Sequence, residues 1–227
     1  MSFVMWAKKV LVRVGIPPSW HLRAFLEFLA FGAWLKQQGR VDRFARREQY
    51  YEHLAKWLGQ NPVDFLEFGV YRGGTLRQWL ALNANPCSRF WGFDSFAGFP
   101  RDWITLARTV PQSEFDTKGC LPDIRDPRLT FVKGFFQDSL PAFLKGFSRE
   151  NRLILHLDAD MYASTLYVLV KMDDYLAPGS ILLFDELSTG IDEFRALRDY
   201  TEAFRRELKP IAMAGDTWEH VALEVVR

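Results

Sequence analysis

The chain has 227 residues, a length that suits one α/β domain with some additional structure. Hydrophobic residues make up 48% of the chain and aromatic residues 15%, so the composition excludes a disordered protein and predicts a sizeable core. A formal net charge of +1 provides no strong overall field, which argues against a nucleic-acid-binding protein.

Residues 1–60 are expected to form a basic, helical N-terminal extension, with helices roughly over Ser19–Gln60. The apolar run Ala24–Leu35 is shorter than the ~20 residues that cross a membrane, and Glu27 interrupts it. The start of the chain also lacks the pattern of a signal peptide. Three roles stay open for the extension: a lid over the site, a contact in a homodimer, and an amphipathic helix on a membrane surface.

Residues 61–227 alternate short apolar runs with amphipathic stretches, which is typical of a β-α-β-α order. Runs rich in Val, Ile, Leu and Phe predict buried strands at 63–68, 89–93, 129–132, 153–157, 180–184, 210–213 and 220–226. Helices are expected at 75–83, 139–145, 164–176 and 192–208. The fold class is therefore α/β, Rossmann-like, with a mostly parallel seven-stranded sheet and helices on both faces. In such sheets, ligands bind at the carboxyl ends of the strands.

The first strand runs into a glycine-containing turn, from Glu67 through Gly69 and Gly73 to Thr75. Glycines allow a tight turn and a close approach to a ligand, and Thr75 can cap the next helix. The spacing G-x-x-x-G differs from the dinucleotide fingerprint G-x-G-x-x-G, and no Gly-Lys-Ser/Thr of a P-loop follows. The turn predicts a strand–loop–helix ligand site of another kind.

The second strand ends at Asp94 and leads into a long stretch, Ser95–Pro127, that contains six prolines or glycines and no clear period. Long loops inside compact domains are commonly lids or binding loops. We expect this one to overhang the site, with aromatic side chains at Phe96, Phe99 and Trp103. The alternative is an ordinary loop with a short helix near Trp103–Arg108.

Acidic residues follow two later strands, Asp158 after one and Asp185-Glu186 after the next. Three carboxylates at neighbouring strand ends would repel one another unless a hard cation lay between them, and oxygen ligands suit Mg²⁺. The alternative is that Asp185 caps a helix and Asp158 only adjoins a ligand. His156 and His220 have little support as site residues.

Four segments in this order resemble class I S-adenosylmethionine-dependent methyltransferases, and more closely the macrocin O-methyltransferase (TylF-like) family of antibiotic sugar methyltransferases. They are FLEFGVYRGGT at 65–75, WGFDSFAGFP at 91–100, GFFQDSLP at 134–141, and LHLDADMYAST at 155–165 with ILLFDEL at 181–187. The resemblance implies an O-methyltransferase that acts on a hydroxyl of a sugar or glycosylated small molecule.

The resemblance also implies a binding site for S-adenosyl-L-methionine. Glu67, the Gly69 loop and Thr75 would hold its amino-acid end, Asp94 would accept hydrogen bonds from both ribose hydroxyls, and residues 136–138 would contact adenine. The expected cofactor residues are Glu67, Gly69, Tyr71, Gly73, Thr75, Asp94, Ser95, Phe136, Gln137 and Asp138. For Glu67 a buried ion pair is the alternative, and for Phe136 a place in the core.

Related methyltransferases place a metal at positions that match Asp158, Asp185 and Glu186, commonly with two consecutive Asp residues. Here Glu186 has a longer side chain, which makes it the least secure of the three ligands. A metal would stabilise the acceptor alkoxide while a carboxylate takes the proton. Asp158 is the first choice for this general base, and Asp160 is the second.

Two other functions stay open from the sequence. One is a metal-independent methyltransferase that acts on an amino sugar or a small phenol, and the other is a scaffold with the cofactor fold and no catalysis. Cys87 and Cys120 form neither a C-x-x-C pair nor a disulfide framework, as expected for a cytoplasmic protein.

Overall fold

The computed structural model describes residues 19–105 and 108–227. Its α-helices are α2 Trp20–Gln37, α3 Arg47–Leu58, α4 Gly74–Leu82, α5 Phe136–Leu144, α6 Tyr162–Met172 and α7 Glu193–Phe204. The longer strands are β2 Val63–Phe68, β3 Arg89–Asp94, β6 Leu129–Lys133, β7 Arg152–Leu157, β8 Ile181–Phe184, β9 Leu208–Ala214 and β10 His220–Val225. Short strands lie at β1 Asp42–Phe44, β4 Trp103–Ile104 and β5 Thr109–Val110, and short 3₁₀ helices at Asp173–Tyr175 and Leu187–Thr189.

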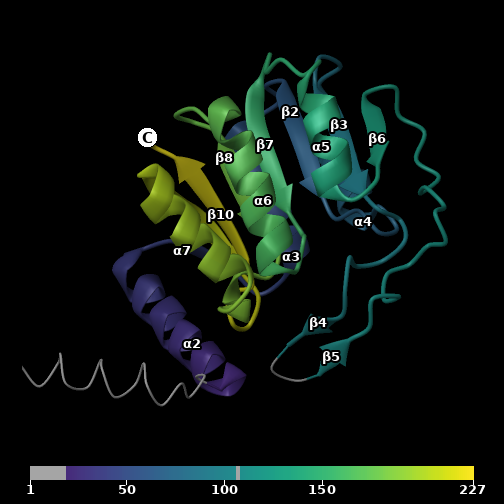
Figure 1. Ribbon diagram of the computed structural model, residues 1–227. Helices are drawn as coiled ribbons and strands as arrows, with labels where there is room; N and C mark the ends of the chain where they lie inside the picture. Colours follow the sequence, from purple (N-terminus) through teal and green to yellow (C-terminus); the bar gives the residue numbers. More distant parts are fainter. Residues whose placement is uncertain (1–18, 106–107) are drawn as a thin grey trace, which may run out of the picture.

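The main sheet has the strand order β1-β9-β10-β8-β7-β2-β3-β6, and every pairing is parallel except those of β10 (Figure 1). The α/β class with a mostly parallel sheet is confirmed. The sheet has eight strands where seven were expected, because β1 pairs with β9. From β2 the chain first builds outward through β3 and β6, then returns to the other side of β2 with β7 and β8. The order therefore reverses between β2 and β7, where a ligand crevice is expected.

Helices cover both faces of the sheet, because successive strand residues point to opposite sides. In β2, Phe65 packs with α3 and α4, whereas Leu66 and Phe68 pack on the face that α5, α6 and α7 cover. Helix α2 lies outside α7 (Figure 1), and an ion pair between Glu27 of α2 and Arg198 of α7 joins the two helices. The central strands β2, β7 and β8 are thus buried on both faces, as the apolar runs predicted, whereas the edge strands β1 and β6 are partly exposed.

Ser19–Gln60 was expected to be helical, but this is only partly correct. Residues 42–44 form the edge strand β1 between two helices. A three-residue strand is too short to leave a periodic signal. Ser19 caps α2 by accepting the amide of Leu22 at 3.2 Å, and α2 leaves Leu22, Phe25, Leu26 and Leu29 exposed. Within the described ranges, no helix is both long enough and apolar enough to cross a membrane. Residues 1–18 of the extension lie outside the described residues.

The part of the long segment 95–127 that carries β4 and β5 lies on the side of the carboxyl ends of the strands, and the chain then returns along the sheet edge to the start of β6 (Figure 1). The short helix considered near Trp103–Arg108 is wrong for the described part, since Trp103 and Ile104 pair with Val110 and Thr109 as two antiparallel strands. Residues 106–107 between them lie outside the described ranges. The hairpin is tied to the domain by a small apolar cluster of Phe99, Trp103, Val110 and Met161.

Candidate active site

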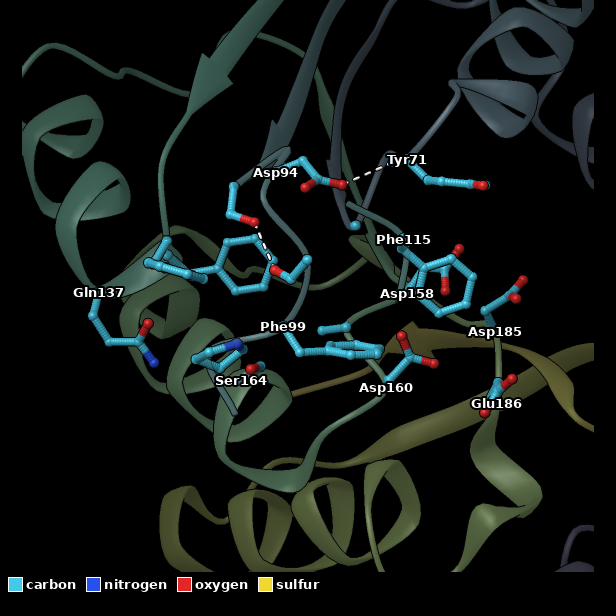
Figure 2. Close-up of a pocket in the computed structure, with 17 residues that line it drawn as sticks. Tyr71, Asp94, Phe99, Phe115, Gln137, Asp158, Asp160, Ser164, Asp185 and Glu186 are labelled. Carbon is cyan, nitrogen blue, oxygen red and sulfur yellow. Dashed lines mark hydrogen bonds between the residues drawn. The ribbon is translucent and has the colours of Figure 1, made fainter. Parts of the chain in front are cut away.

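A pocket of about 270 Å³ opens where the strand order reverses, at the carboxyl ends of β2, β3, β7 and β8 (Figure 2). Segment 95–127 supplies one wall, and the start of α5 supplies another. Nine of the expected site residues line the pocket: Gly69, Tyr71, Asp94, Ser95, Phe136, Gln137, Asp158, Asp185 and Glu186. Four do not: Glu67, Gly73, Thr75 and Asp138.

Gly69 lies where β2 and β7 approach each other most closely. Its φ of +102° lies in the region that favours glycine, and a Cβ built there would be 1.7 Å from the carbonyl oxygen of Asp158. Backbone hydrogen bonds hold this approach, from Gly69 to Phe93 at 2.9 Å and from Asp158 to Phe68 at 3.0 Å. The glycine therefore allows the floor of the pocket to close.

Asp94 ties the turn after β2 to the turn after β3. Its Oδ2 accepts the amides of Val70 and Tyr71, both at 2.8 Å, and its Oδ1 accepts the amide of Phe96 at 2.7 Å (Figure 2). Since each carboxylate oxygen has about two lone-pair positions, Oδ2 is fully used and Oδ1 keeps one position for a ligand hydroxyl. The carboxylate both organises the pocket and lines it.

Glu67 is buried in β2 and faces α3 rather than the pocket, in register with His156 of β7. Its Oε2 has no hydrogen-bond partner, and burial together with the nearby charge of Asp185 raises its pKa well above the usual range. Successive strand residues point to opposite faces of the sheet, so Glu67 points away from the face of Phe68, and the chain reaches the pocket only at Gly69. Thr75 is buried in α4, and Gly73 packs against Pro122 and Ile124. Any contact of these residues with a cofactor stays a prediction.

Four carboxylates gather at the ends of β7 and β8: Asp158, Asp160, Asp185 and Glu186 (Figure 2). Loss of solvent, followed by the charges of Asp185 and Asp160, raises the pKa of Asp158 well above its usual range. Loss of solvent and the charge of Glu186 raise the pKa of Asp160, and burial with the charge of Asp185 raises that of Glu186. Among the described residues none of these three groups forms an ion pair, although the charge of Arg47 acts on Asp158 and that of His220 opposes the rise in the pKa of Glu186.

Asp185 differs, because basic side chains already surround it. Arg47 Nη1 lies 3.3 Å from its Oδ1, His220 Nδ1 lies 3.1 Å away, and His156 Nε2 lies 3.9 Å away. Burial alone would raise the pKa of Asp185, but the hydrogen bond to His220 and the charges of His156 and Arg47 lower it. The sequence argument treated Asp185 as uncompensated, and the structure corrects this.

Sequence reasoning missed part of this surrounding layer. Tyr51 of α3 shares a hydrogen bond of 3.0 Å with His156 Nε2, and burial lowers the pKa of His156 to about 4, which keeps it neutral near pH 7. His156 lies two positions before Asp158 in the sequence, and this closeness is a signal that could have been used. Arg47 belongs to the extension, 138 residues away from Asp185, and no local pattern indicates it.

Glu193, the first residue of α7, is a second omission. It is completely buried, and its Oε2 accepts the backbone amide of Glu186 at 3.0 Å. Burial raises its pKa well above the usual range, and the hydrogen bond from Glu186 only partly opposes this. The side chain therefore holds the turn that carries Asp185 and Glu186.

The carboxylates are not arranged as a ready metal cage. Across residues 19–105 and 108–227, no group of three or more His, Cys, Asp or Glu side chains is placed to hold a metal ion. Oxygen ligands of the right chemical type do line one pocket, and Mg²⁺ usually keeps several waters and binds through only one or two carboxylates. The donor chemistry thus fits Mg²⁺, although the three expected ligands do not converge.

The aromatic residues of the long segment divide between two places. Phe99 lines the pocket, Phe96 is fully buried in the core on the α3 and α4 face, and Trp103 donates from Nε1 to Asp192 Oδ2 at 2.9 Å. Phe115, which the sequence analysis did not single out, also lines the pocket. Only Phe99 of the three expected aromatic residues faces the ligand space.

Comparison with known proteins finds a family and relatives that match most of the chain. The family model described as macrocin O-methyltransferase (TylF) matches residues 44–219. A Streptomyces olivaceus protein, 8-demethyl-8-(2,3-dimethoxy-α-L-rhamnosyl)-tetracenomycin-C 4′-O-methyltransferase, is 28% identical over 181 residues, which cover 71% of this chain and 67% of that one. Demethyldecarbamoylnovobiocin O-methyltransferase of Streptomyces niveus is 27% identical over 186 residues, which cover 71% and 68%.

Solved structures share the fold. The calicheamicin methyltransferase CalS11, also described as a TDP-rhamnose 3′-O-methyltransferase, superposes with a TM-score of 0.61 at 24% identity and covers 79% of this chain and 80% of its own. The protein cmcI, described with Mg and SAM, superposes with a TM-score of 0.51 at 20% identity over 80% and 72% of the two chains. At such identities the likeness concerns architecture.

Proposed function

The chain belongs to the macrocin O-methyltransferase (TylF) family, and on this premise we propose that it transfers the methyl group of S-adenosyl-L-methionine to a sugar hydroxyl of a glycosylated small molecule. The observation that carries the proposal is a single pocket lined both by the residues expected to bind the cofactor and by four carboxylates. A methyl donor and a group that takes up a proton would then lie side by side.

On the cofactor side, Gly69, Asp94, Phe136 and Gln137 are the proposed contacts. Asp94 keeps one acceptor position, on Oδ1, for a ribose hydroxyl, and its other positions are taken by backbone amides. Phe136 offers a ring at the first turn of α5, where adenine could stack. The bound cofactor supplies a methyl group on a positively charged sulfur. Several carboxylates in the lining favour that charge.

On the acceptor side, Asp158 is the proposed general base and Asp160 the second candidate. A sugar hydroxyl is a weak nucleophile near pH 7 and must lose its proton as the new O–C bond forms. Loss of solvent and neighbouring charges raise the pKa of both carboxyls, which makes each a stronger base once it is ionised. Glu193, buried behind Glu186, would keep this part of the pocket in place.

Mg²⁺ is the proposed metal cofactor, held by Asp158, Asp185 and Glu186. Bound there, it would stabilise an alkoxide on the acceptor. The carboxylates without an ion pair among the described residues support the proposal, and so does the shared fold of cmcI, which is described with Mg and SAM. Arg47 would have to share Asp185 with the metal.

Metal-independent methyl transfer, for example to an amino sugar or a small phenol, is the second candidate. The observation in its favour is that the described residues offer no cluster of three metal-binding side chains and that Arg47 already forms an ion pair with Asp185. Both candidates are enzymes of the cytoplasm, which suits the exposed, unpaired Cys87 and Cys120.

One set of measurements tests the proposal. Isothermal titration should show micromolar binding of S-adenosylhomocysteine, and methyl transfer to a rhamnoside should stop with EDTA and return with MgCl₂. Asp158→Asn should reduce turnover by at least roughly 100-fold, within the usual contribution of a general base, while it leaves S-adenosylhomocysteine affinity within a few fold. Full activity in EDTA would favour the second candidate, and absence of S-adenosylhomocysteine binding would refute both.

A further inference from the structure

Phe115 stands out among the residues that line the pocket because it is a large apolar side chain with 42% of its surface exposed. Its ring meets Tyr71 edge-to-face, with centroids 5.1 Å apart, and Phe99 in the same way at 5.5 Å. Figure 2 shows the ring next to Phe99, on the side of the pocket that holds the carboxylates. Because Phe115 both lines the pocket and keeps 42% of its surface exposed, its ring is accessible to a ligand in the pocket.

The backbone at Phe115 is strained. Its φ of +63° lies in the left-handed region, which bulky residues rarely adopt. Turn hydrogen bonds on either side hold it there, from Glu114 to Pro111 at 2.9 Å and from Asp116 to Ser113 at 3.2 Å. Strain of this kind persists where the surrounding structure enforces it, and it often marks a functional position. Here it turns the aromatic ring into the pocket rather than into the core.

The support under Phe115 is rigid. Phe99 donates its amide to Gln112 at 2.8 Å and packs against Trp103, which is hydrogen-bonded to Asp192 at the start of α7. Asp192 also accepts the amide of Tyr162 at 3.1 Å, so the segment is fixed to α6 as well. The ring of Phe115 is therefore presented on a fixed base, as a recognition surface requires.

The charge of the pocket limits what can lie against that ring. All charged residues of the described lining are acidic, namely Asp94, Asp158, Asp160, Asp185 and Glu186. A diphosphate would bring further negative charge next to carboxylates that already outnumber the positive charges of the proposed sulfonium and Mg²⁺. An uncharged ring would instead gain contact area with Phe115 and Phe99 without that repulsion.

We propose that Phe115 is a specificity-determining residue, whose ring is the platform for an uncharged, flat group attached to the sugar that is methylated. The proposal rests on the proposed function and deepens it. The hydroxyl enters toward the carboxylates, the attached group lies against Phe115 at the exposed rim, and glycosides are preferred over sugar nucleotides.

Two rhamnose compounds test this. The relatives described above include one named for a rhamnosyl tetracenomycin and one, CalS11, named for TDP-rhamnose, so the group attached to the rhamnose differs between them. The probes are p-nitrophenyl α-L-rhamnopyranoside and TDP-L-rhamnose, assayed with S-adenosylmethionine at saturation. We expect kcat/KM to be at least about tenfold higher for the p-nitrophenyl glycoside, in the range that one unfavourable charge contact produces. A higher kcat/KM for TDP-L-rhamnose would overturn the proposal.

The variant Phe115→Asn separates the role of the ring from its effect on folding. Asparagine tolerates a left-handed backbone, so the melting temperature should be unchanged or higher. The KM for the p-nitrophenyl glycoside should rise by about tenfold or more, as expected when a stacked ring is lost, while S-adenosylhomocysteine affinity stays within about twofold. Phe115→Trp should restore the KM to within about threefold of the wild type.

The matched control is Phe204→Asn on α7, since Phe204 is 40% exposed and does not line the pocket. It should leave both KM values unchanged. An unchanged KM in Phe115→Asn would overturn the assignment of Phe115. Methyl transfer to neither probe, with S-adenosylhomocysteine still bound, would overturn the assigned acceptor class and leave cofactor binding standing. Loss of S-adenosylhomocysteine binding in the wild type would refute the proposed function itself.

Discussion

Replacement of Gly69 by alanine should damage the site more than its size suggests. The added Cβ would lie 1.7 Å from the carbonyl oxygen of Asp158 and 2.8 Å from its carbonyl carbon. Ordinary contact begins at 3.4 Å, and the obstacle is backbone that cannot rotate away. The turn after β2 and the turn after β7 must therefore separate by roughly 1.5 Å, which moves Asp158 relative to Asp94.

The cost has two sources. An L-residue with a φ of +102° is strained by about 1–2 kcal/mol, and separation of the two turns weakens the Gly69–Phe93 and Asp158–Phe68 hydrogen bonds at about 1 kcal/mol each. We expect the free energy of unfolding to fall by about 3 kcal/mol, which lowers the melting temperature of a chain of this length by about 6–12 °C. A shift of this size in the site should also reduce turnover about 100-fold.

Gly74→Ala is the control, because an added Cβ there meets nothing within 4 Å and alanine favours the helix α4 that begins at this residue. Thermal unfolding followed by circular dichroism and titration with S-adenosylhomocysteine compare the two variants. Gly74→Ala should match the wild type or exceed its melting temperature by a few degrees, about 1–3 °C. If Gly69→Ala melts within about 2 °C of the wild type and keeps its affinity, the proposed closeness of β2 and β7 is wrong.

Two further predictions concern carboxylates that are not proposed to take up the proton or hold the metal. Asp94→Asn should weaken S-adenosylhomocysteine binding by about tenfold or more in calorimetry, because an amide cannot accept all the backbone amides that Asp94 accepts; affinity within twofold would contradict this. Asp64 is buried, and although burial opposes it, hydrogen bonds from Arg89, Asn151 and Glu150 lower its pKa. Its stabilisation is therefore present above the unfolded-state pKa near 4 and is lost as the pH falls through the lower folded value. Asp64→Asn should reduce the melting temperature at pH 7 by roughly 3–10 °C, and this difference should shrink below about pH 4; an equal difference at both pH values would refute the pairing.

Much of the site was accessible from the sequence because it follows the ends of strands. Asp94, Asp158 and Asp185 each end or follow an apolar run, and parallel strands bring such ends to one edge. Nine of the expected residues therefore line one pocket. Glu67 lies inside β2 and its side chain faces the side of the sheet away from the pocket. Because side chains alternate between the two faces of a strand, a shift of one position is enough to cause this.

Contacts between distant segments were not accessible. Arg47 reaches Asp185 across 138 positions, and Phe115 meets Tyr71 only because segment 95–127 folds back over the strand ends. Neither residue belongs to a periodic pattern, and Phe115 adopts a backbone conformation that its residue type disfavours. The edge strand β1 was hidden for a related reason, since its partner β9 lies at the other end of the chain.

The amino-acid order by itself determined the α/β class, the positions of the buried strands and the acidic character of their carboxyl ends, because apolar periodicity and strand-end chemistry are local properties. Only the tertiary structure decided which groups meet: that Arg47 and His220 lie against Asp185, that Glu193 holds the neighbouring turn, and that Phe115 faces the pocket. Electrostatic and packing energies depend on separation in space, and the chain sets that separation only when it has folded.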